Sequence, residues 1–201
     1  MLRLTAVARC CLVAFIWASA AVPSFAGERI ALVIGNSHYA YANQLTNPVN
    51  DANLLSSVLQ EQGFKVTRTI DANQHDMKRA FSEFAGRLQA AGPDTVALVY
   101  YAGHGVQFRG VNYLIPIDAK IDSEAQLDLE AISAGSIMQA IGAAGSTLNI
   151  VILDACRNSP FRSFRAVNRG LAAIDAPKGT LVAFSTAPGD AARDGHEEDA
   201  R

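Results

Sequence analysis

The sequence predicts an α/β fold of three layers, in which helices cover both faces of a mainly parallel sheet of about five strands. Two observations support this prediction. Short runs rich in β-branched and aliphatic residues alternate along the chain with longer segments in which apolar residues recur at helical spacing. In addition, the chain has 201 residues, half of them apolar, which suits one globular domain with a sizeable core.

Five apolar runs predict the strands. The first, residues 30–34, is apolar throughout and ends at Gly35, which is typical of a strand that is buried on both faces. The second, residues 64–69, alternates apolar and polar side chains, so we expect it nearer a sheet edge. The remaining strands are expected at residues 95–101, 148–153 and 180–185, and residues 106–115 predict a small hairpin around Arg109 and Gly110.

Three segments predict helices. Asn47 and Pro48 are typical of a helix cap followed by the first helical position, and Gly63 ends this helix. The clearest helix follows Asn73, where a stripe of large apolar residues favours packing in the core over binding a ligand. The stripe consists of Met77, Phe81, Phe84 and Leu88. A weaker helical segment carries Ile137 and Ile141 on one face.

The N-terminal segment, residues 1–26, predicts a signal peptide. Two arginines precede an apolar run from Cys10 to Val22 that is too short for a comfortable membrane span. We therefore expect cleavage after Ala26 and an exported protein, periplasmic or secreted, with no membrane segment in its mature form. A retained membrane anchor is the competing interpretation. Residues 27–195 are then the folded domain, and residues 196–201 are a polar tail.

The net charge argues against nucleic acid as a partner. The chain carries a formal charge of −2, which becomes −4 when the two arginines of the signal peptide are removed. Such a charge gives no basic field that would attract a phosphate backbone.

Cysteine usage draws attention to one thiol. Of the three cysteines, Cys10 and Cys11 leave with the signal peptide, so Cys156 is alone in the mature chain. Cysteines of exported proteins usually form disulfides. A lone one is either an inert buried residue or a reactive thiol, and counting alone leaves both interpretations open.

The predicted strand order brings this thiol next to a histidine. Gly103, His104 and Gly105 follow one buried strand, and Asp154 to Cys156 follow the next. Ligands of parallel sheets gather at the carboxyl ends of the strands, so we expect His104 and Cys156 to meet there. An imidazole can take the proton of a thiol, which then attacks as thiolate, and return it to a leaving amine. The amides of Gly105 and Cys156 are the predicted oxyanion hole.

Two motifs resemble a known family. Residues 100–105 (YYAGHG) and 153–157 (LDACR) resemble the two catalytic motifs of the caspase superfamily of cysteine peptidases. Residues 30–36 and 47–52 are similar to the first strand and helix of bacterial caspase-like domains, metacaspases and orthocaspases. The resemblance covers residues 29–190. It implies a cysteine endopeptidase that acts on protein or peptide substrates, with Cys156 as nucleophile and His104 as acid–base partner.

One difference from animal caspases bears on the substrate. They have glutamine two positions before the nucleophile, where this chain has Asp154. Metacaspases place aspartates in the substrate pocket and prefer arginine or lysine, and by resemblance Asp154 and Asp51 are this pair. Two carboxylates would bind a guanidinium through charge-assisted hydrogen bonds. The alternative for Asp51 is electrostatic stabilisation of a helix N-terminus.

The resemblance also implies expectations about regulation. Related enzymes are often cut after the nucleophile, where this chain has a basic segment, so we hypothesise self-cleavage at Arg162, Arg165, Arg169 or Lys178. We expect no cofactor and no metal site. An acidic stretch could hold the calcium that some metacaspases require, although a solvated acidic loop is the simpler interpretation; it contains Asp118, Asp122, Glu124 and Asp128.

The end of the sequence departs from the family pattern. Relatives continue into another helix and a closing strand, whereas residues 196–201 are polar. We therefore expect an exposed sheet edge at residues 180–185 that favours self-association. An inactive caspase-like domain that serves as a binding or scaffold module is the alternative function, and a cysteine hydrolase acting on non-peptide amides is a third. The group that orients His104 stays open, a backbone carbonyl being one candidate.

Overall fold

The structure is a computed structural model that describes residues 27–156 and 171–185. The predictions for residues 1–26 and 196–201, and for Arg162, Arg165 and Arg169, lie outside the described residues. Of Cys156, the backbone is described and the side chain is not.

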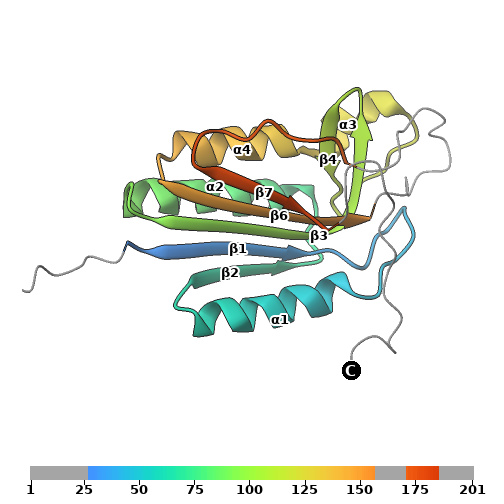
Figure 1. The fold of residues 1–201 in the computed structure, drawn as a ribbon. Helices are drawn as coiled ribbons and strands as arrows, with labels where there is room; N and C mark the ends of the chain where they lie inside the picture. Colours follow the sequence, from blue (N-terminus) through green and yellow to red (C-terminus); the bar gives the residue numbers. More distant parts are fainter. Residues whose placement is uncertain (1–26, 157–170, 186–201) are drawn as a thin grey trace, which may run out of the picture.

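Five parallel strands form the centre of the molecule (Figure 1). The first strand along the chain is an inner one. The second strand pairs with it on one side, and the later strands follow on the opposite side. Across the sheet the order is β2 (Lys65–Ile70), β1 (Arg29–Gly35), β3 (Val96–Phe108), β6 (Leu148–Cys156) and β7 (Thr180–Phe184). This arrangement confirms the predicted mainly parallel sheet, and it makes the carboxyl ends of β1 and β3 a place where the direction of winding reverses.

The strand β3 is longer than the sequence predicts. It continues past Tyr101 to Phe108, turns at Arg109 and Gly110, and pairs antiparallel with β4 (Val111–Leu114). Both turn residues have positive φ, 50° and 84°, as a tight two-residue hairpin turn requires. A short strand β5 (Ile132–Ser133) pairs with β4. The predicted hairpin is confirmed, but His104 lies inside a continuous strand and not in a loop after it.

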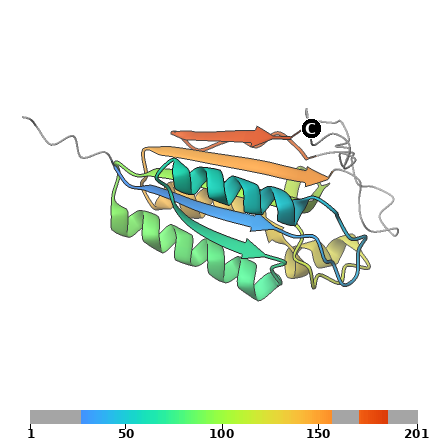
Figure 2. The ribbon, with the colours of Figure 1, turned by 90° about the horizontal axis from the view of Figure 1, so that it is seen from below.

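Helices cover both faces of the sheet, as predicted (Figures 1 and 2). The helix α1 (Pro48–Glu61) lies on one face, and α2 (Gln74–Ala91) and α4 (Ala134–Ala143) lie on the other. Alternate residues of the inner strands β1, β3 and β6 pack into the two cores on opposite faces of the sheet. In β1, Leu32 packs on the side of α2 and α4, whereas Val33 packs on the side of α1.

The helix ends follow local chemistry. Pro48 occupies the first turn of α1, where its missing N–H is harmless, but the side chain of Asn47 makes no capping hydrogen bond. Asn73 caps α2 by accepting from the amide of Asp76 at 2.9 Å. All four residues of the predicted apolar stripe, Met77, Phe81, Phe84 and Leu88, are buried. Each such side chain contributes about 1.5–3 kcal/mol on burial, which explains why this helix was predictable.

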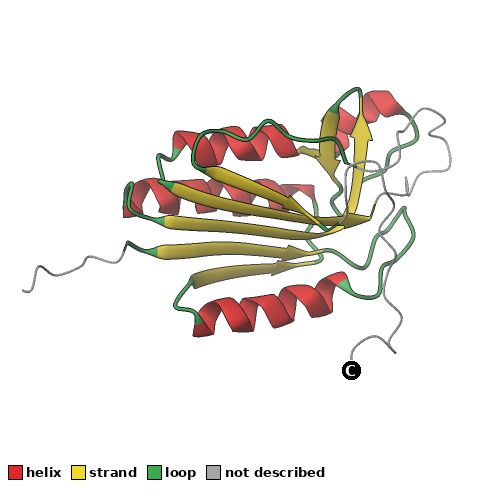
Figure 3. Ribbon diagram, viewed as in Figure 1, coloured by secondary structure: helices red, strands yellow, loops and turns green. Residues whose placement is uncertain are grey.

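A small second core lies around the hairpin of β3 and β4, whose ribbon is drawn in Figure 3. It contains Tyr39, Val106, Tyr113 and Leu127. Leu127 begins α3 (Leu127–Glu130), which follows the 3-10 turn η1 (Glu124–Gln126), and neither element was predicted. This core packs the loop after β1 against the hairpin and thereby builds one side of the candidate site.

The two outermost parallel strands have one described neighbour each. β2 pairs with β1 and β7 pairs with β6. The described part of the chain contains no helix with the length and apolarity that crossing a membrane requires.

Candidate active site

His104 and Cys156 are partners in the register of the sheet. β3 and β6 run side by side and parallel, and His104 is paired with Cys156 at the carboxyl ends of both strands. Neighbouring strands are spaced about 4.8 Å apart, so the two backbones are adjacent. The structure therefore brings these two residues together where the strand order predicted.

The imidazole of His104 is enclosed and oriented by the loop after β1. Its Nε2 atom lies 2.7 Å from the carbonyl oxygen of Asn43, and the residue is only 4% exposed. A carbonyl only accepts hydrogen bonds, so we infer that Nε2 carries the proton. In the neutral ring, Nδ1 is then the basic nitrogen. The orienting group that the sequence left open is thus a backbone carbonyl.

Tyr39 holds the same histidine from another side. Its ring centroid lies 4.4 Å from that of the imidazole, at an interplanar angle of 48°. Its hydroxyl accepts the backbone amide of His104 at 2.8 Å. Both the ring and the backbone of His104 are therefore positioned by one residue that the sequence did not single out.

Asp71, at the end of β2, anchors the loop that carries Tyr39 and Asn43. Its carboxylate accepts the amides of Ser37 at 2.8 Å and His38 at 3.0 Å, and the His38 ring at 2.6 Å. Burial opposes the ionised form, but the hydrogen bonds from His38 and Ser37 outweigh it and keep the pKa of Asp71 below its ordinary value. The charged carboxylate thus stabilises the loop.

The buried side chain of Asn36 fixes the start of this loop. Its oxygen accepts the amide of Ala72 at 2.9 Å, and its nitrogen lies 3.3 Å from the carbonyl oxygen of Ile115. Asn36 thereby joins the end of β1 to the segment before α2 and to the end of the hairpin. No local sequence pattern predicts these contacts.

The glycines on either side of His104 are required by the chain itself. A Cβ atom on Gly103 would lie 2.5 Å from the Tyr39 hydroxyl oxygen and 2.7 Å from that of Tyr101, and φ is +155°. A Cβ atom on Gly105 would lie 2.8 Å from the Cβ atom of Ala155. Side chains of this protein therefore occupy the space that a Cβ atom at either glycine would need.

Tyr101 supports the strand where it carries His104. It is fully buried, and its hydroxyl donates to the carbonyl of His104 at 2.8 Å and lies 3.0 Å from that of Ile115. A buried hydroxyl bridging two carbonyls ties β3 to the segment after β4. This role was not predicted, because the sequence pattern places Tyr101 in a buried strand and gives it no further function.

Asp154 and Asp51 both act on Tyr100, whose side chain packs on the α1 side of the sheet. The hydroxyl of Tyr100 donates to Asp154 at 3.2 Å. Burial raises the pKa of Tyr100 above its ordinary value, as do the negative charges of Asp154 and Asp51 and the hydrogen bond to Asp154. Asp154 is two residues before Cys156 on β6, and Asp51 is in the first turn of α1. The structure thus joins Asp154 to the phenol, and the negative charge of Asp51 acts on the same group from α1.

The acidic stretch has local structural roles. Asp118 accepts the amide of Gln74 at 2.9 Å. Asp128 accepts the hydroxyl of Tyr113 at 2.6 Å, and burial together with Asp128 raises the pKa of Tyr113 to about 12. Within residues 27–156 and 171–185 there is no group of three or more His, Cys, Asp or Glu side chains that could hold a metal ion.

Lys178 is exposed in the turn that leads into β7. The amide of Thr180 donates to the carbonyl of Pro177 at 3.0 Å and closes this turn. Because β7 runs parallel to β6, Lys178 lies at the opposite end of the sheet from Cys156.

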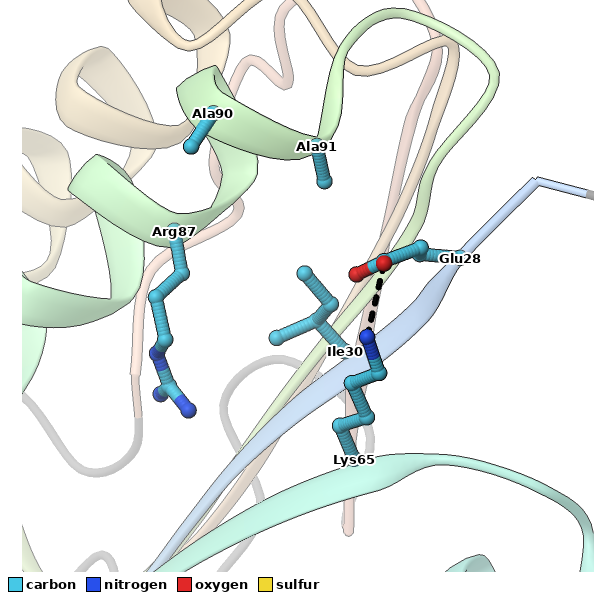
Figure 4. Close-up of a pocket in the computed structure, with 6 residues that line it drawn as sticks. All are labelled: Glu28, Ile30, Lys65, Arg87, Ala90 and Ala91. Carbon is cyan, nitrogen blue, oxygen red and sulfur yellow. Dashed lines mark hydrogen bonds and ion pairs between the residues drawn. The ribbon is translucent and has the colours of Figure 1, made fainter.

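A pocket of about 290 Å³ also lies at that opposite end (Figure 4). It contains none of the predicted site residues, and an ion pair of 2.6 Å between Lys65 and Glu28 forms one side. Its lining consists of Glu28, Ile30, Lys65, Arg87, Ala90 and Ala91.

Comparisons with known proteins show the family to which the chain is similar. The sequence model of the caspase domain matches residues 28–200. The human mucosa-associated lymphoid tissue lymphoma translocation protein 1 is 30% identical over 132 residues, which are 66% of this chain and 15% of that protein. The chain therefore spans a small part of this relative.

Two solved caspase structures share the fold. The structure of pro-sf-caspase-1 superposes with a TM-score of 0.54 at 18% identity, over 81% of this chain and 62% of that one. The Drosophila initiator caspase Dronc superposes with a TM-score of 0.53 at 15% identity, over 80% and 56%. At such identities the likeness shows the fold.

Proposed function

The chain belongs to the caspase domain family, and on this premise we propose that it is a cysteine endopeptidase that cleaves after arginine or lysine. The observation that carries the proposal is the register pair of His104 and Cys156, in which the histidine is oriented by the Asn43 carbonyl. A cysteine on the strand next to an oriented imidazole supports nucleophilic catalysis, which requires a thiol and a base on neighbouring positions.

The proposed reaction begins with proton transfer from the Cys156 thiol to Nδ1 of His104. The thiolate attacks the scissile carbonyl carbon, and the resulting imidazolium gives its proton to the leaving amine. A thioester remains on Cys156. Water, deprotonated by His104, attacks this thioester, the C–S bond breaks, and the new carboxyl terminus leaves. His104 returns the proton to the sulfur of Cys156 and restores the thiol. The Asn43 carbonyl keeps the ring in place and stabilises its charged form throughout.

The backbone amides of Gly105 and Cys156 are the proposed oxyanion hole. Ile115 donates to the carbonyl of His104 at 3.0 Å, so the backbone groups of His104 are directed toward β4. Backbone groups of consecutive strand residues point to opposite edges. The amide of Gly105 is therefore directed toward β6, where Cys156 lies.

Asp51 and Asp154 are the proposed site for the basic side chain. Asp154 precedes the nucleophile by two residues on β6, and Asp51 lies in the first turn of α1. Two such carboxylates would repel an acidic substrate side chain and attract a cationic one. Asp154 accepts the hydroxyl of Tyr100, and beside burial the negative charges of Asp154 and Asp51 both raise the pKa of this tyrosine, which supports the assignment.

The test compares fluorogenic peptides that end in arginine, lysine or aspartate, with wild type and Cys156→Ala. We expect arginine and lysine peptides to be cleaved and the alanine variant to be inactive, while both proteins show the same unfolding transition. Preference for aspartate would refute the acidic pair and leave the dyad. Absence of cleavage by well-folded wild type would refute the peptidase and favour the binding or scaffold module.

We further propose that residues 1–26 direct export and are then removed. The mature protein should begin at Gly27, which N-terminal sequencing of material from the extracytoplasmic fraction tests. A full-length N-terminus in the membrane fraction would instead support the retained anchor.

A further inference from the structure

We propose that Tyr100 is a positioning residue that fixes Asp154, one of the acidic pair, for a planar guanidinium, so that this protein selects arginine over lysine. The inference rests on the proposed cleavage after basic residues, and it adds a residue and a preference that the carboxylates alone do not imply.

The sheet places the Tyr100 side chain on the face covered by α1. Tyr100 packs there with Leu98 and Ala102, and it is only 7% exposed. On β6, Ile152 is the register partner of Tyr100, and Asp154 is the partner of Ala102, one alternation nearer the carboxyl end. The phenol therefore extends along this face toward the edge where Asp154 lies, and reaches it at 3.2 Å.

The hydrogen bond from Tyr100 occupies one of the two oxygens of the Asp154 carboxylate. The single hydroxyl proton of Tyr100 is donated to Oδ2. This contact holds the carboxylate in one rotational position and leaves Oδ1 available to a ligand. Because burial and the two carboxylates raise the pKa of Tyr100 above its ordinary value, the phenol stays a donor throughout the neutral and mildly alkaline range.

A fixed carboxylate favours one kind of cation. Guanidinium offers five N–H donors in a rigid plane, so it gains most when its acceptors stand at set positions. Asp51 supplies a second carboxylate from α1, which offers the guanidinium a further acceptor. An ammonium group is a compact charge with three rotatable donors. Its binding therefore depends less on the rotational position of the carboxylate.

Tyr100→Phe tests the inference because it removes the hydroxyl and keeps the ring. The variant loses the hydrogen bond to the charged Asp154, which stabilises the bound arginine side chain only indirectly. We therefore expect kcat/KM for the arginine peptide to fall about fivefold to tenfold, mainly through KM. The lysine peptide should change less than about twofold, so the arginine-to-lysine ratio falls. An equal loss for both peptides, or no change in the ratio, would overturn the inference.

Tyr113→Phe is the matched control. It removes the other tyrosine–aspartate hydrogen bond, 2.6 Å to Asp128, which lies outside the proposed pocket. This variant should leave the arginine-to-lysine ratio at the wild-type value. Urea unfolding of both variants shows whether each is folded under the assay conditions.

A binding experiment separates this inference from the proposed reaction. In the Cys156→Ala background, acetyl-arginine amide and acetyl-lysine amide are titrated by calorimetry with and without Tyr100→Phe. Tighter arginine binding that the phenylalanine removes would support the role of Tyr100 even if wild type cleaves nothing, in which case only the peptidase proposal fails. A ratio of affinities that Tyr100→Phe does not change would overturn the inference even if peptides are cleaved.

Discussion

The ring of Tyr39 lies against the imidazole of His104, with centroids 4.4 Å apart, while the Tyr39 hydroxyl accepts the amide of the same residue. One side chain thus controls both the position of the proposed acid–base group and the path of the strand that carries it. Tyr39 belongs to the small core around the hairpin, so the packing of that core determines where the histidine stands.

Removing the Tyr39 hydroxyl should weaken both catalysis and folding. Tyr39→Phe keeps the ring contact, but the buried amide of His104 loses the hydroxyl that accepts its hydrogen bond. We expect the free energy of unfolding to fall by about 1–3 kcal/mol and kcat to fall more than KM changes. Urea unfolding and steady-state kinetics measure these effects. Unchanged kcat in a folded variant would show that Tyr39 does not position His104.

Alanine at Gly103 or Gly105 should destabilise the protein. The added Cβ atom would lie 2.5 Å from the Tyr39 hydroxyl oxygen in the first case and 2.8 Å from the Cβ atom of Ala155 in the second. Strain and overpacking of this kind cost about 1–3 kcal/mol each. Gly86→Ala is the control, because nothing lies near its Cβ position on α2, and it should stabilise by about 0.5–1 kcal/mol. Equal unfolding midpoints for all three variants would contradict the packing argument.

Acid should weaken the loop that holds His104. The pKa of Asp71 is lower in the folded protein than its ordinary value of 3.8, so its contribution to stability is complete above that value and is lost as the pH falls through the folded pKa. Asp71→Asn should therefore be less stable than wild type at pH 7 by about 1–3 kcal/mol, and this difference should shrink below about pH 4. Denaturant unfolding at several pH values measures it. A difference that stays constant with pH would exclude a role for the charge.

Cleavage at Lys178, if it occurs, should take place between molecules. Seven residues of β6 separate the level of Thr180 from Cys156, which corresponds to about 23 Å at the rise of a parallel strand. The rate of this cut should therefore rise with protein concentration, and active protein should cut added Cys156→Ala protein at Lys178. Mass spectrometry of the new termini reports both. A rate that does not depend on concentration would show that the turn before β7 moves to the site of its own molecule.

Removal of metal ions should leave the peptidase activity unchanged. Two residues of the acidic stretch, Asp118 and Asp128, accept hydrogen bonds from protein donors. Activity before and after treatment with a chelator tests this, and a loss of activity that calcium restores would assign a calcium requirement to this protein.

The sequence predicted those parts of the fold that depend on local patterns. The apolar run in β1 and the helical stripe from Met77 to Leu88 are buried as expected. The meeting of His104 with Cys156 followed from a general property of parallel sheets, that strand ends share an edge. Predicting such features requires only the local sequence pattern and the direction of the strands.

The supports of the site could not be predicted in this way. Tyr39 and Asn43 contact His104 from more than sixty positions away, and no spacing rule links them. The extension of β3 was missed because Gly103 and Gly105 resemble a loop, whereas they admit the Tyr39 hydroxyl and Ala155 into a continuous strand. The orientation of His104 and the extension of β3 both depend on side chains and backbone groups from distant segments of the chain.

The contact between His104 and Asn43 has a consequence for mutagenesis. The group that orients the imidazole belongs to the main chain, so every amino acid at position 43 offers the same oxygen. Substitution of the Asn43 side chain would leave that function in place, and an alanine scan would score the position as neutral. What must be preserved is the length and path of residues 36–47, because a single inserted residue would carry the carbonyl away from Nε2 while leaving each functional side chain in the sequence.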